Sequence, residues 1–195
     1  MGLAQYALLQ HGYRLQRKNL RTQTDVKIAT VIGFPLGNTL SKVKAFEAEQ
    51  SLELGADELD MVINIGALKD ANEKFVISDI ESVVRVASSK SAIVKVIIET
   101  RLLANSEKEL ACLLAERAGA DFVKTSTGFA GEGKGAKVED IRLMYNCVGD
   151  KLRIKAAGGI KDCKTALKMI KAGASRLGCS HSVQIYEEFR RNSGT

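Results

Sequence analysis

The feature that most constrains the fold is a regular alternation, from residue 26 onward, of short β-branched runs with amphipathic helical stretches. Glycines stand at many of the joints, as is usual where strands and helices meet. We expect strands at VKIATVIGF (26–34), ELDMVINI (58–65), IVKVIIE (93–99), DFVKTST (121–127), RIKAA (153–157) and SRLG (175–178). We expect helices near 41–54, 72–88, 105–118, 137–147, 162–172 and 182–191. Strict βα alternation requires a parallel sheet, in either a barrel or a doubly wound arrangement.

Six predicted strands fall short of the eight in a closed barrel. The chain has 195 residues, whereas (β/α)8 chains typically reach about 250 and rarely fall below about 200. Residues 1–25 show no strand pattern, and QYALLQHGYRLQRKNLR predicts a helix. We therefore expect one α/β domain over residues 1–195, of the (β/α)8 TIM-barrel type. We expect it to be incomplete, with about six βα units and an atypical helical N-terminal segment at 1–25.

The composition is that of an ordinary globular domain, with 45% hydrophobic and 27% charged residues. No apolar run approaches the roughly 18 residues that a membrane span needs, and charges follow the N-terminal apolar stretch instead of preceding it as in a secretory signal. The cysteines, which form no CxxC pair, are Cys112, Cys147, Cys163 and Cys179. This spacing predicts reduced, packed thiols in a cytoplasmic protein, with neither a disulfide framework nor a zinc site.

The net charge of +6 raises the question of a nucleic-acid partner. Residues 1–30 carry five basic residues against a single acid, Asp25. This segment has no interleaved aromatic residues and no recognised binding motif, so we expect no nucleic-acid partner. Lysines inside the predicted strands instead indicate an anionic small molecule as the ligand.

Side-chain parity predicts a polar cluster inside the barrel. Side chains alternate between two faces along a strand, and in a barrel one face meets the helices and the other the lumen. In four consecutive predicted strands the apolar residues share one parity, and the other parity holds Asp60, Lys95, Lys124 and Lys155. Because the apolar parity packs against helices, we expect these four side chains to converge in the lumen.

Such a cluster has a chemical use. A lysine held beside another cation in a partly desolvated pocket has its pKa lowered, because the ammonium form is disfavoured. The free amine attacks carbonyls and forms a Schiff base, which makes Lys124, on a central strand, a candidate nucleophile. Asp60 can balance the charge and relay protons. The structural alternative, which the residues leave open, is a polar barrel centre in which Asp60, Glu58 and Glu99 merely neutralise the lysines.

Three glycine-containing turns follow the last three predicted strands, at 125–128 (TSTG), 157–159 (AGG) and 178–180 (GCS). Glycine lets backbone N–H groups approach an anion, and a helix N-terminus adds a positive end. Barrels commonly bind phosphate at the loops after their last two strands. The turns together predict a phosphate site beside the lysines, although each alone is compatible with a plain βα turn.

With these residues the chain resembles the deoxyribose-phosphate aldolases, which are class I aldolases with a (β/α)8 barrel. The resemblance covers about residues 26–190 in the family's order and spacing, and the strings FVKTSTG and LDMVINIGAL are its most specific parts. The matching segments are VIGFPLG (31–37), KAFEAE (44–49), GADELDMVINIGAL (55–68), IVKVIIET (93–100), GADFVKTSTGF (119–129), IKAAGGI (154–160) and RLGCS (176–180).

The resemblance implies a role for each matching residue. Lys124 forms the Schiff base, Lys155 is the second lysine that lowers the pKa of the first, and Asp60 is the acid of the proton relay. The implied reaction is reversible cleavage of 2-deoxy-D-ribose 5-phosphate to D-glyceraldehyde 3-phosphate and acetaldehyde, with no metal or other cofactor. The implied substrate and phosphate contacts are Thr127, Gly128, Gly158, Gly159, Gly178 and Ser180.

The sequence departs from the family pattern at two places. His181 stands where the family usually has a second serine, and we expect it to be a tolerated change at the rim of the site, a new catalytic base being the alternative. The family opens with an Asp-His-Thr-Leu type strand, a helix and a Cys-Val-Asn-Pro type strand, and neither motif occurs here. The resemblance thus predicts a barrel without its first two strands, whose unpaired sheet edges favour a homo-oligomer.

Alternatives to an active aldolase remain. One is a truncated, catalytically impaired relative with an interaction role or no function. The others are a Schiff-base lyase for a different aldehyde and a nucleic-acid accessory role for the basic N-terminal segment.

Overall fold

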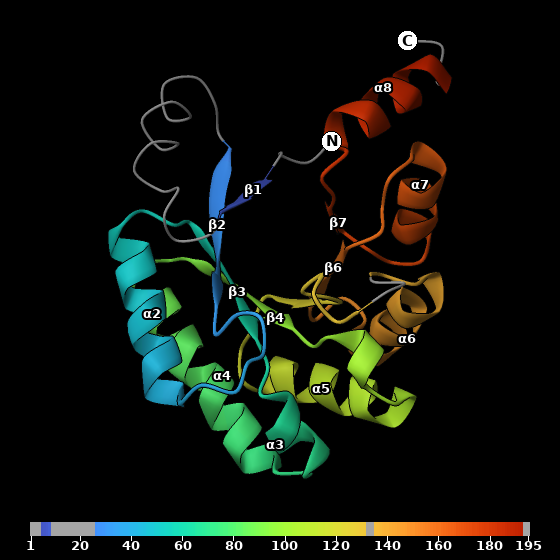
Figure 1. Ribbon diagram of the computed structural model, residues 1–195. Coiled ribbons are helices and arrows are strands. Elements are labelled where there is room, and N and C mark those ends of the chain that lie inside the picture. The colour runs from blue at the N-terminus through green and yellow to red at the C-terminus, as the bar shows by residue number, and fades with distance from the viewer. Residues whose placement is uncertain (1–4, 9–25, 132–134, 193–195) are drawn as a thin grey trace.

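The computed structural model describes residues 5–8, 26–131 and 135–192, which form one curved sheet with helices on its outer side (Figure 1). All seven strands run parallel, in the order β1 to β7, and each is paired with its neighbours in the sequence. The strands are β1 (Gln5–Leu8), β2 (Lys27–Ile32), β3 (Glu58–Val62), β4 (Ile93–Ile97), β5 (Phe122–Lys124), β6 (Arg153–Ala157) and β7 (Arg176–Gly178). Because β1 and β7 do not pair with each other, the described sheet is an open barrel.

Each strand from β2 to β7 is followed by helix, which confirms the six predicted βα units. The helices are α2 (Ser41–Glu53), α3 (Ile65–Lys69), α4 (Glu73–Ser88), η2 (Thr100–Leu102), α5 (Asn105–Arg117), α6 (Val138–Val148), α7 (Cys163–Lys171) and α8 (Ser182–Asn192). Side-chain caps fix several of the starts. Asn72 accepts a hydrogen bond from the Phe75 amide at the start of α4, and Asp162 accepts one from the Thr165 amide at the start of α7.

The prediction that residues 1–25 contain no strand is wrong at Gln5–Leu8. These four residues form β1, which pairs in parallel with β2 from Gln5 opposite Lys27 to Leu8 opposite Thr30. A run of four residues is too short to distinguish the periods of helix and strand, and here the free edge of β2 decides the outcome by offering backbone hydrogen bonds. The helix predicted for the rest of this segment falls on residues 9–25, outside the described residues.

The apolar parity of the strands packs against the helices, as predicted. From the β3 and β4 segments, the buried core on this face includes Leu59, Met61, Ile63, Val94, Val96 and Ile98. Each of these side chains is at most 1% exposed. Burial of a side chain of this size contributes about 1.5–3 kcal/mol, so the register that places the polar parity in the lumen is strongly favoured over a shift by one residue.

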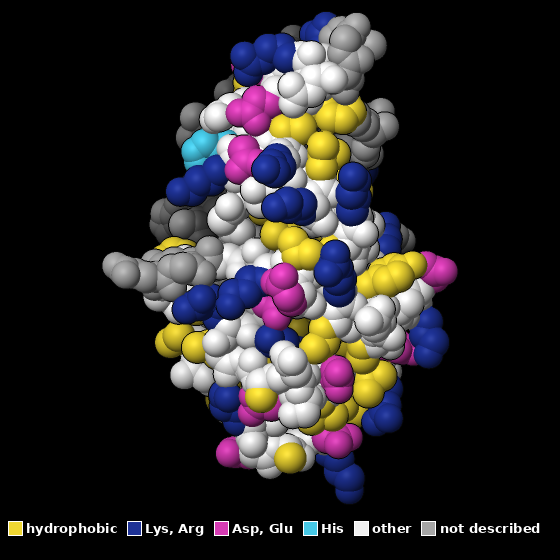
Figure 2. Space-filling view, turned by 90° about the vertical axis from the view of Figure 1, so that its right-hand side faces the viewer, with side chains coloured by type: hydrophobic (Ala, Val, Ile, Leu, Met, Phe, Trp, Pro, Cys, Tyr) yellow, Lys and Arg dark blue, Asp and Glu magenta, His cyan; other side chains and the backbone are white. Residues whose placement is uncertain are grey.

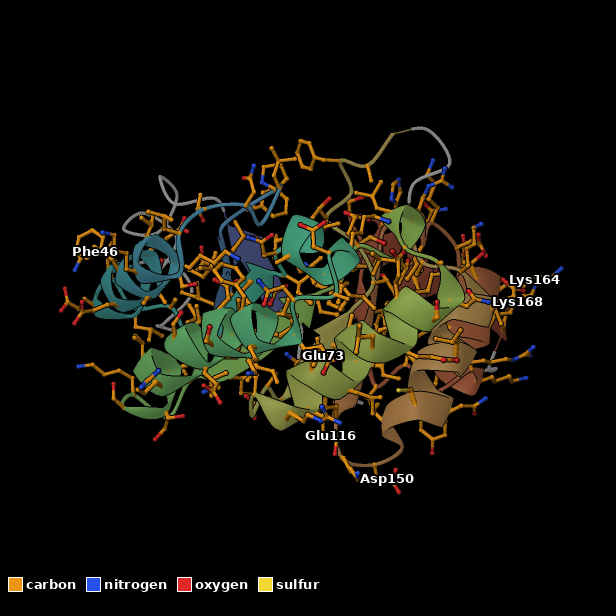
Figure 3. The ribbon with its side chains drawn as sticks, turned by 90° about the horizontal axis from the view of Figure 1, so that it is seen from below. Phe46, Glu73, Glu116, Asp150, Lys164 and Lys168 are labelled. Carbon is orange, nitrogen blue, oxygen red and sulfur yellow. The ribbon has the colours of Figure 1, made fainter. Side chains whose placement is uncertain are left out.

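The outer surface of the helices is charged. Figure 3 looks up at the barrel from below and shows Glu73, Glu116 and Asp150 along the outside of the helical layer, with Lys164 and Lys168 of α7 pointing away from the sheet. Figure 2 shows the adjoining face, where lysine and arginine side chains alternate with apolar ones. In the part of the chain that the structure describes, no helix is long and apolar enough to cross a membrane.

Candidate active site

The register of four neighbouring strands brings the predicted polar cluster together. Asp60 of β3 lies opposite Lys95 of β4, and Lys124 of β5 lies opposite Lys155 of β6. The β4–β5 pairing places Lys124 beside Ile97, two residues beyond Lys95. The three lysines therefore approach one carboxylate from three consecutive strands, and all four side chains are buried.

Asp60 is the centre of this cluster, with both carboxylate oxygens engaged. Its Oδ2 accepts hydrogen bonds from Lys124 Nζ at 2.8 Å and from Lys155 Nζ at 2.8 Å. Its Oδ1 accepts from Lys95 Nζ at 2.7 Å. Lys95 also lies 2.6 Å from Glu58 Oε2. Two amines sharing one buried oxygen atom can exchange a proton through it without solvent.

The charges of the cluster shift the pKa of two of its members. Burial acts to raise the pKa of Asp60, but the ammonium groups of Lys124, Lys155 and Lys95 outweigh it and hold the pKa well below its usual range. Burial lowers the pKa of Lys155 to about 8, against the attraction of Asp60 and with the help of the Lys124 and Lys95 cations. Asp60 is therefore an anion at neutral pH, and Lys155 changes its charge near the physiological range.

The turn after β5 shows a contact that the sequence did not indicate. The Glu99 carboxylate accepts hydrogen bonds from the Thr127 amide, at 2.8 Å, and from the Thr127 hydroxyl. Thr127 Oγ1 in turn accepts from the Phe129 amide at 3.1 Å. Both donors of Thr127 thus serve Glu99 in this structure. Glu99, which is 2% exposed, sits in the left-handed region with φ of 53°, a costly backbone for a non-glycine residue.

The glycines predicted to bind phosphate occupy turns that only glycine adopts readily. Gly128, Gly158 and Gly159 have φ of 91°, 86° and 74°. The Gly158 amide donates to the Gly178 carbonyl at 3.3 Å, so it already serves the contact between β6 and β7. A Cβ at Gly178 would lie 3.4 Å from Lys155 Cε, and this glycine therefore keeps open the space beside that lysine.

Ser180 and His181 lie together at the start of α8. Ser180 Oγ is 3.2 Å from His181 Nδ1, and both residues are exposed. None of the described residues forms a His, Cys, Asp and Glu group suited to a metal ion. The four cysteines are free thiols.

Sequence reasoning placed Lys95 in the lumen but assigned it no function, and it mentioned Glu99 only as a neutralising charge. For Lys95 the signal was present, because it has the parity of Asp60. Glu99 also has the parity of Lys95, but its contact with Thr127 had no signal, since nothing in the string IVKVIIET marks a left-handed residue. The structure places Lys124 and Lys155 each in contact with Asp60, and the catalytic and binding roles predicted for the site residues stay predictions.

The parallel βα barrel and the buried lysine–aspartate cluster define the class of enzyme to which this chain belongs, the class I aldolases. Comparison with known proteins identifies the family. The family model for DeoC/LacD aldolases matches residues 4–186, and the chain belongs to this family.

Individual relatives agree with this assignment. The chain is 58% identical, over 185 residues, to a protein named deoxyribose-phosphate aldolase from Thermococcus kodakarensis, with 93% of this chain and 82% of the relative covered. Among solved structures, QR15, an aldolase, superimposes with a TM-score of 0.87 at 38% identity, covering 96% of this chain and 81% of that one. The tetrameric deoxyribose phosphate aldolase from Aeropyrum pernix gives a TM-score of 0.83 at 34% identity, covering 94% and 76%. These matches confirm the predicted family and the barrel fold class.

Proposed function

We propose that this protein is a deoxyribose-phosphate aldolase, which reversibly cleaves 2-deoxy-D-ribose 5-phosphate to D-glyceraldehyde 3-phosphate and acetaldehyde. The observation that carries the proposal is the single buried oxygen, Asp60 Oδ2, that Lys124 and Lys155 share at 2.8 Å each. The relatives named deoxyribose-phosphate aldolase support the choice of substrate.

Lys124 is the nucleophile in this proposal. Its free amine adds to the C1 aldehyde of the open-chain sugar, and loss of water gives a protonated Schiff base. This cation draws electrons from the C2–C3 bond. The C3 hydroxyl loses its proton, the bond breaks, and glyceraldehyde 3-phosphate leaves. The enamine that remains on the lysine is protonated at C2, and hydrolysis then releases acetaldehyde and the free amine.

Asp60 and Lys155 handle the protons of these steps. An amine with a pKa of about 8 is present in both charge states near neutral pH, which suits a group that both accepts and returns protons. Lys155 contacts the same oxygen as Lys124, so it can take the proton that Lys124 must lose before attack. Asp60 is ionised at neutral pH, passes protons between the two amines through Oδ2, and stabilises the positive Schiff base.

The phosphate of the substrate binds, in this proposal, at the turns of Gly128, Gly158 and Gly159, with Gly178 and Ser180 at the adjoining end of β7. The positive φ angles of the first three support this placement, because such glycine turns let the backbone approach an anion closely. We assign Thr127 to the same turn, where its contact with Glu99 holds the backbone in place. The lysine serves as the electron sink, so the reaction requires neither a metal nor an organic cofactor.

The proposal extends to the setting of the enzyme. Free thiols support a cytoplasmic location. The unpaired edges of the described sheet, together with the tetrameric relative from Aeropyrum pernix, support a homo-oligomer. We expect neither nucleic acid nor membrane among the partners.

A second candidate function is that of a catalytically impaired relative. The observation that favours it is the open sheet, because the seven described strands leave the lumen without the enclosure of a closed eight-stranded barrel. Water that reaches the lumen through the open side would weaken every charge interaction there.

A turnover assay decides between the two candidates. The purified chain is incubated with 2-deoxy-D-ribose 5-phosphate, and glyceraldehyde 3-phosphate is followed with a coupled dehydrogenase. In parallel, borohydride reduction in the presence of acetaldehyde traps the Schiff base for peptide mass spectrometry. We expect turnover and an adduct on Lys124 that Lys124→Ala abolishes. An adduct on another lysine, or a chain that neither turns over nor traps acetaldehyde, would exclude the proposed aldolase.

A further inference from the structure

We propose that Lys95 is a positioning residue of this site, which holds Asp60 by one oxygen so that the other oxygen serves Lys124 and Lys155 together. The inference rests on the proposed aldolase function of the cluster and deepens it. Lys95 itself is 0% exposed and bonded to two carboxylates, so it is a structural member of the cluster and not a second nucleophile.

The geometry divides the Asp60 carboxylate into two halves. Lys95 Nζ lies 2.7 Å from Oδ1, whereas Lys124 and Lys155 both contact Oδ2. A carboxylate rotates readily about its terminal bond unless both oxygens are held. With Oδ1 bound to Lys95, the lone pairs of Oδ2 stay directed at the two reacting amines. Without Lys95, Oδ1 would be a buried acceptor that lacks its donor, and the carboxylate would turn to share the remaining lysines between its two oxygens.

Lys95 tolerates complete burial because its positive charge is balanced by the carboxylates of Glu58 and Asp60. Glu58, two residues before Asp60 on β3, lies 2.6 Å from Lys95 and also binds Arg176 of β7 at 2.5 Å. Arg176 lies opposite Lys155 in the register of β6 and β7. Cations and anions therefore alternate along a chain of contacts that runs from Arg176 to Glu58, Lys95 and Asp60 and ends at Lys124 and Lys155. Lys95 joins the Arg176–Glu58 ion pair to Asp60.

The charge of Lys95 also acts on the proton carrier. The groups that face Lys155 are Asp60 of β3, Lys95 of β4, Lys124 of β5 and, from the adjacent strand, Arg176 with its partner Glu58. The Lys95 cation lowers the pKa of Lys155, so its removal raises that pKa above the value of about 8. At neutral pH less of Lys155 would then be the free amine that accepts a proton.

The test replaces Lys95 with methionine and uses Lys44→Met as the matched control. Lys44 is also 0% exposed and also pairs with a buried aspartate, Asp79, but this pair joins helices α2 and α4 and contains none of the residues assigned to the reaction. Competitive labelling with acetic anhydride at a series of pH values, read by peptide mass spectrometry, gives the titration of Lys155 without turnover. The pH dependence of kcat and KM for 2-deoxy-D-ribose 5-phosphate is measured on the same proteins.

For Lys95→Met we expect the labelling midpoint of Lys155 to rise by about one pH unit, roughly a tenfold loss of free amine at neutral pH. We expect kcat to fall with little change in KM, and its rise with pH to move to higher pH. Lys44→Met should leave both pH profiles unchanged. Coincident Lys155 titrations in wild type and Lys95→Met, or an equal shift in Lys44→Met, would overturn the inference.

A second variant separates position from charge and covers a failure of Lys95→Met to fold. Lys95→Gln keeps a hydrogen-bond donor for Oδ1 but removes the cation, so we expect the same shift of the Lys155 titration with a smaller loss of kcat. Equal kcat values for the glutamine and methionine variants would overturn the positioning role. A wild-type chain without turnover would reject the proposed function, whereas the labelling curves would still decide the role of Lys95.

Discussion

At the scale of single residues, the site depends on how one carboxylate divides its oxygens among three amines. Asp60 is buried, yet its pKa is held low because three ammonium groups surround it. The pKa of Lys155 is also lowered, but for this group the shift favours the neutral form, because burial and the neighbouring cations disfavour its ammonium. Each pKa shift makes the free energy of unfolding depend on pH. For Lys155 this dependence lies in a pH range that experiments reach easily.

Stability should depend on pH through Lys155. Its pKa is about 8 in the folded protein and 10.5 in the unfolded reference, so between these values the unfolded chain binds more protons. The unfolding free energy attributable to Lys155 therefore rises as the pH increases from about 8 to 10.5, by up to about 3 kcal/mol. Urea unfolding of wild type and Lys155→Met at pH 7 and pH 10 measures the difference. A gap between the two proteins that stays constant with pH would contradict the prediction.

Glu99 should matter for substrate binding more than for the chemical step. Glu99→Gln keeps the size of the side chain, but it removes the charge that accepts both donors of Thr127. Because hydrogen bonds to charged groups contribute about 1.5–3 kcal/mol, the turn at Gly128 should loosen and KM should rise about tenfold. Lys124 and Asp60 keep their contacts, so kcat should change little. Steady-state kinetics distinguish this outcome from a fall in kcat alone, which would assign Glu99 to the reaction itself.

At the scale of elements, much of the site follows from the strand period. Alternation along β3 and β6 is enough to place Asp60 and Lys155 on the lumen side, and their parallel neighbours follow by the same rule. The alternation of side chains predicts nothing beyond the end of a strand. Glu99 takes a left-handed conformation directly after β4, so the contact with Thr127 arises from a backbone turn that no residue type announces.

The edge of the sheet was unpredictable for a different reason. The pairing of Gln5–Leu8 with β2 depends on an open strand edge, which is a property of the assembled sheet. Tertiary context of this kind overrides local patterns in short segments. The core, by contrast, was predictable because hydrophobic burial acts along every strand at once.

A buried ion pair joins two helices to the sheet and carries a prediction at the same scale. Lys44 of α2 bonds to Asp79 of α4 at 2.5 Å and to the Val62 carbonyl at the end of β3 at 3.0 Å. Asp79→Asn would remove the carboxylate that pairs with the buried ammonium of Lys44, at a cost of about 3–5 kcal/mol in unfolding free energy. The double variant Lys44→Met, Asp79→Leu should recover most of that loss. Thermal and urea unfolding of the three proteins checks this, and an equally unstable double variant would contradict it.

At the scale of the whole molecule, the described sheet ends in two strands whose outer edges are unpaired, and α8 follows one of them, β7. No side chain of α8 is buried, and Val183 and Tyr186 are 71% and 56% exposed. An apolar helix face next to an open strand edge favours association, because both burial and backbone pairing gain from a second copy. We therefore expect the purified chain to self-associate, with a mass by light scattering above that of the single 21.1 kDa chain.

Association through this end of the barrel should be sensitive to charge on α8. Val183→Glu places a carboxylate on the exposed apolar face, so we expect it to shift the chain toward the monomer at micromolar concentration. Ser182→Glu adds the same charge at the first position of the helix, where a negative side chain is favourable, and should leave the mass unchanged. A monomeric wild type would reject the association, and equal effects of the two variants would place the contact elsewhere. If the monomeric Val183→Glu variant also loses turnover while Lys124 and Asp60 are intact, the lumen needs its neighbour to exclude water, and assembly and catalysis are linked through the open side of the barrel.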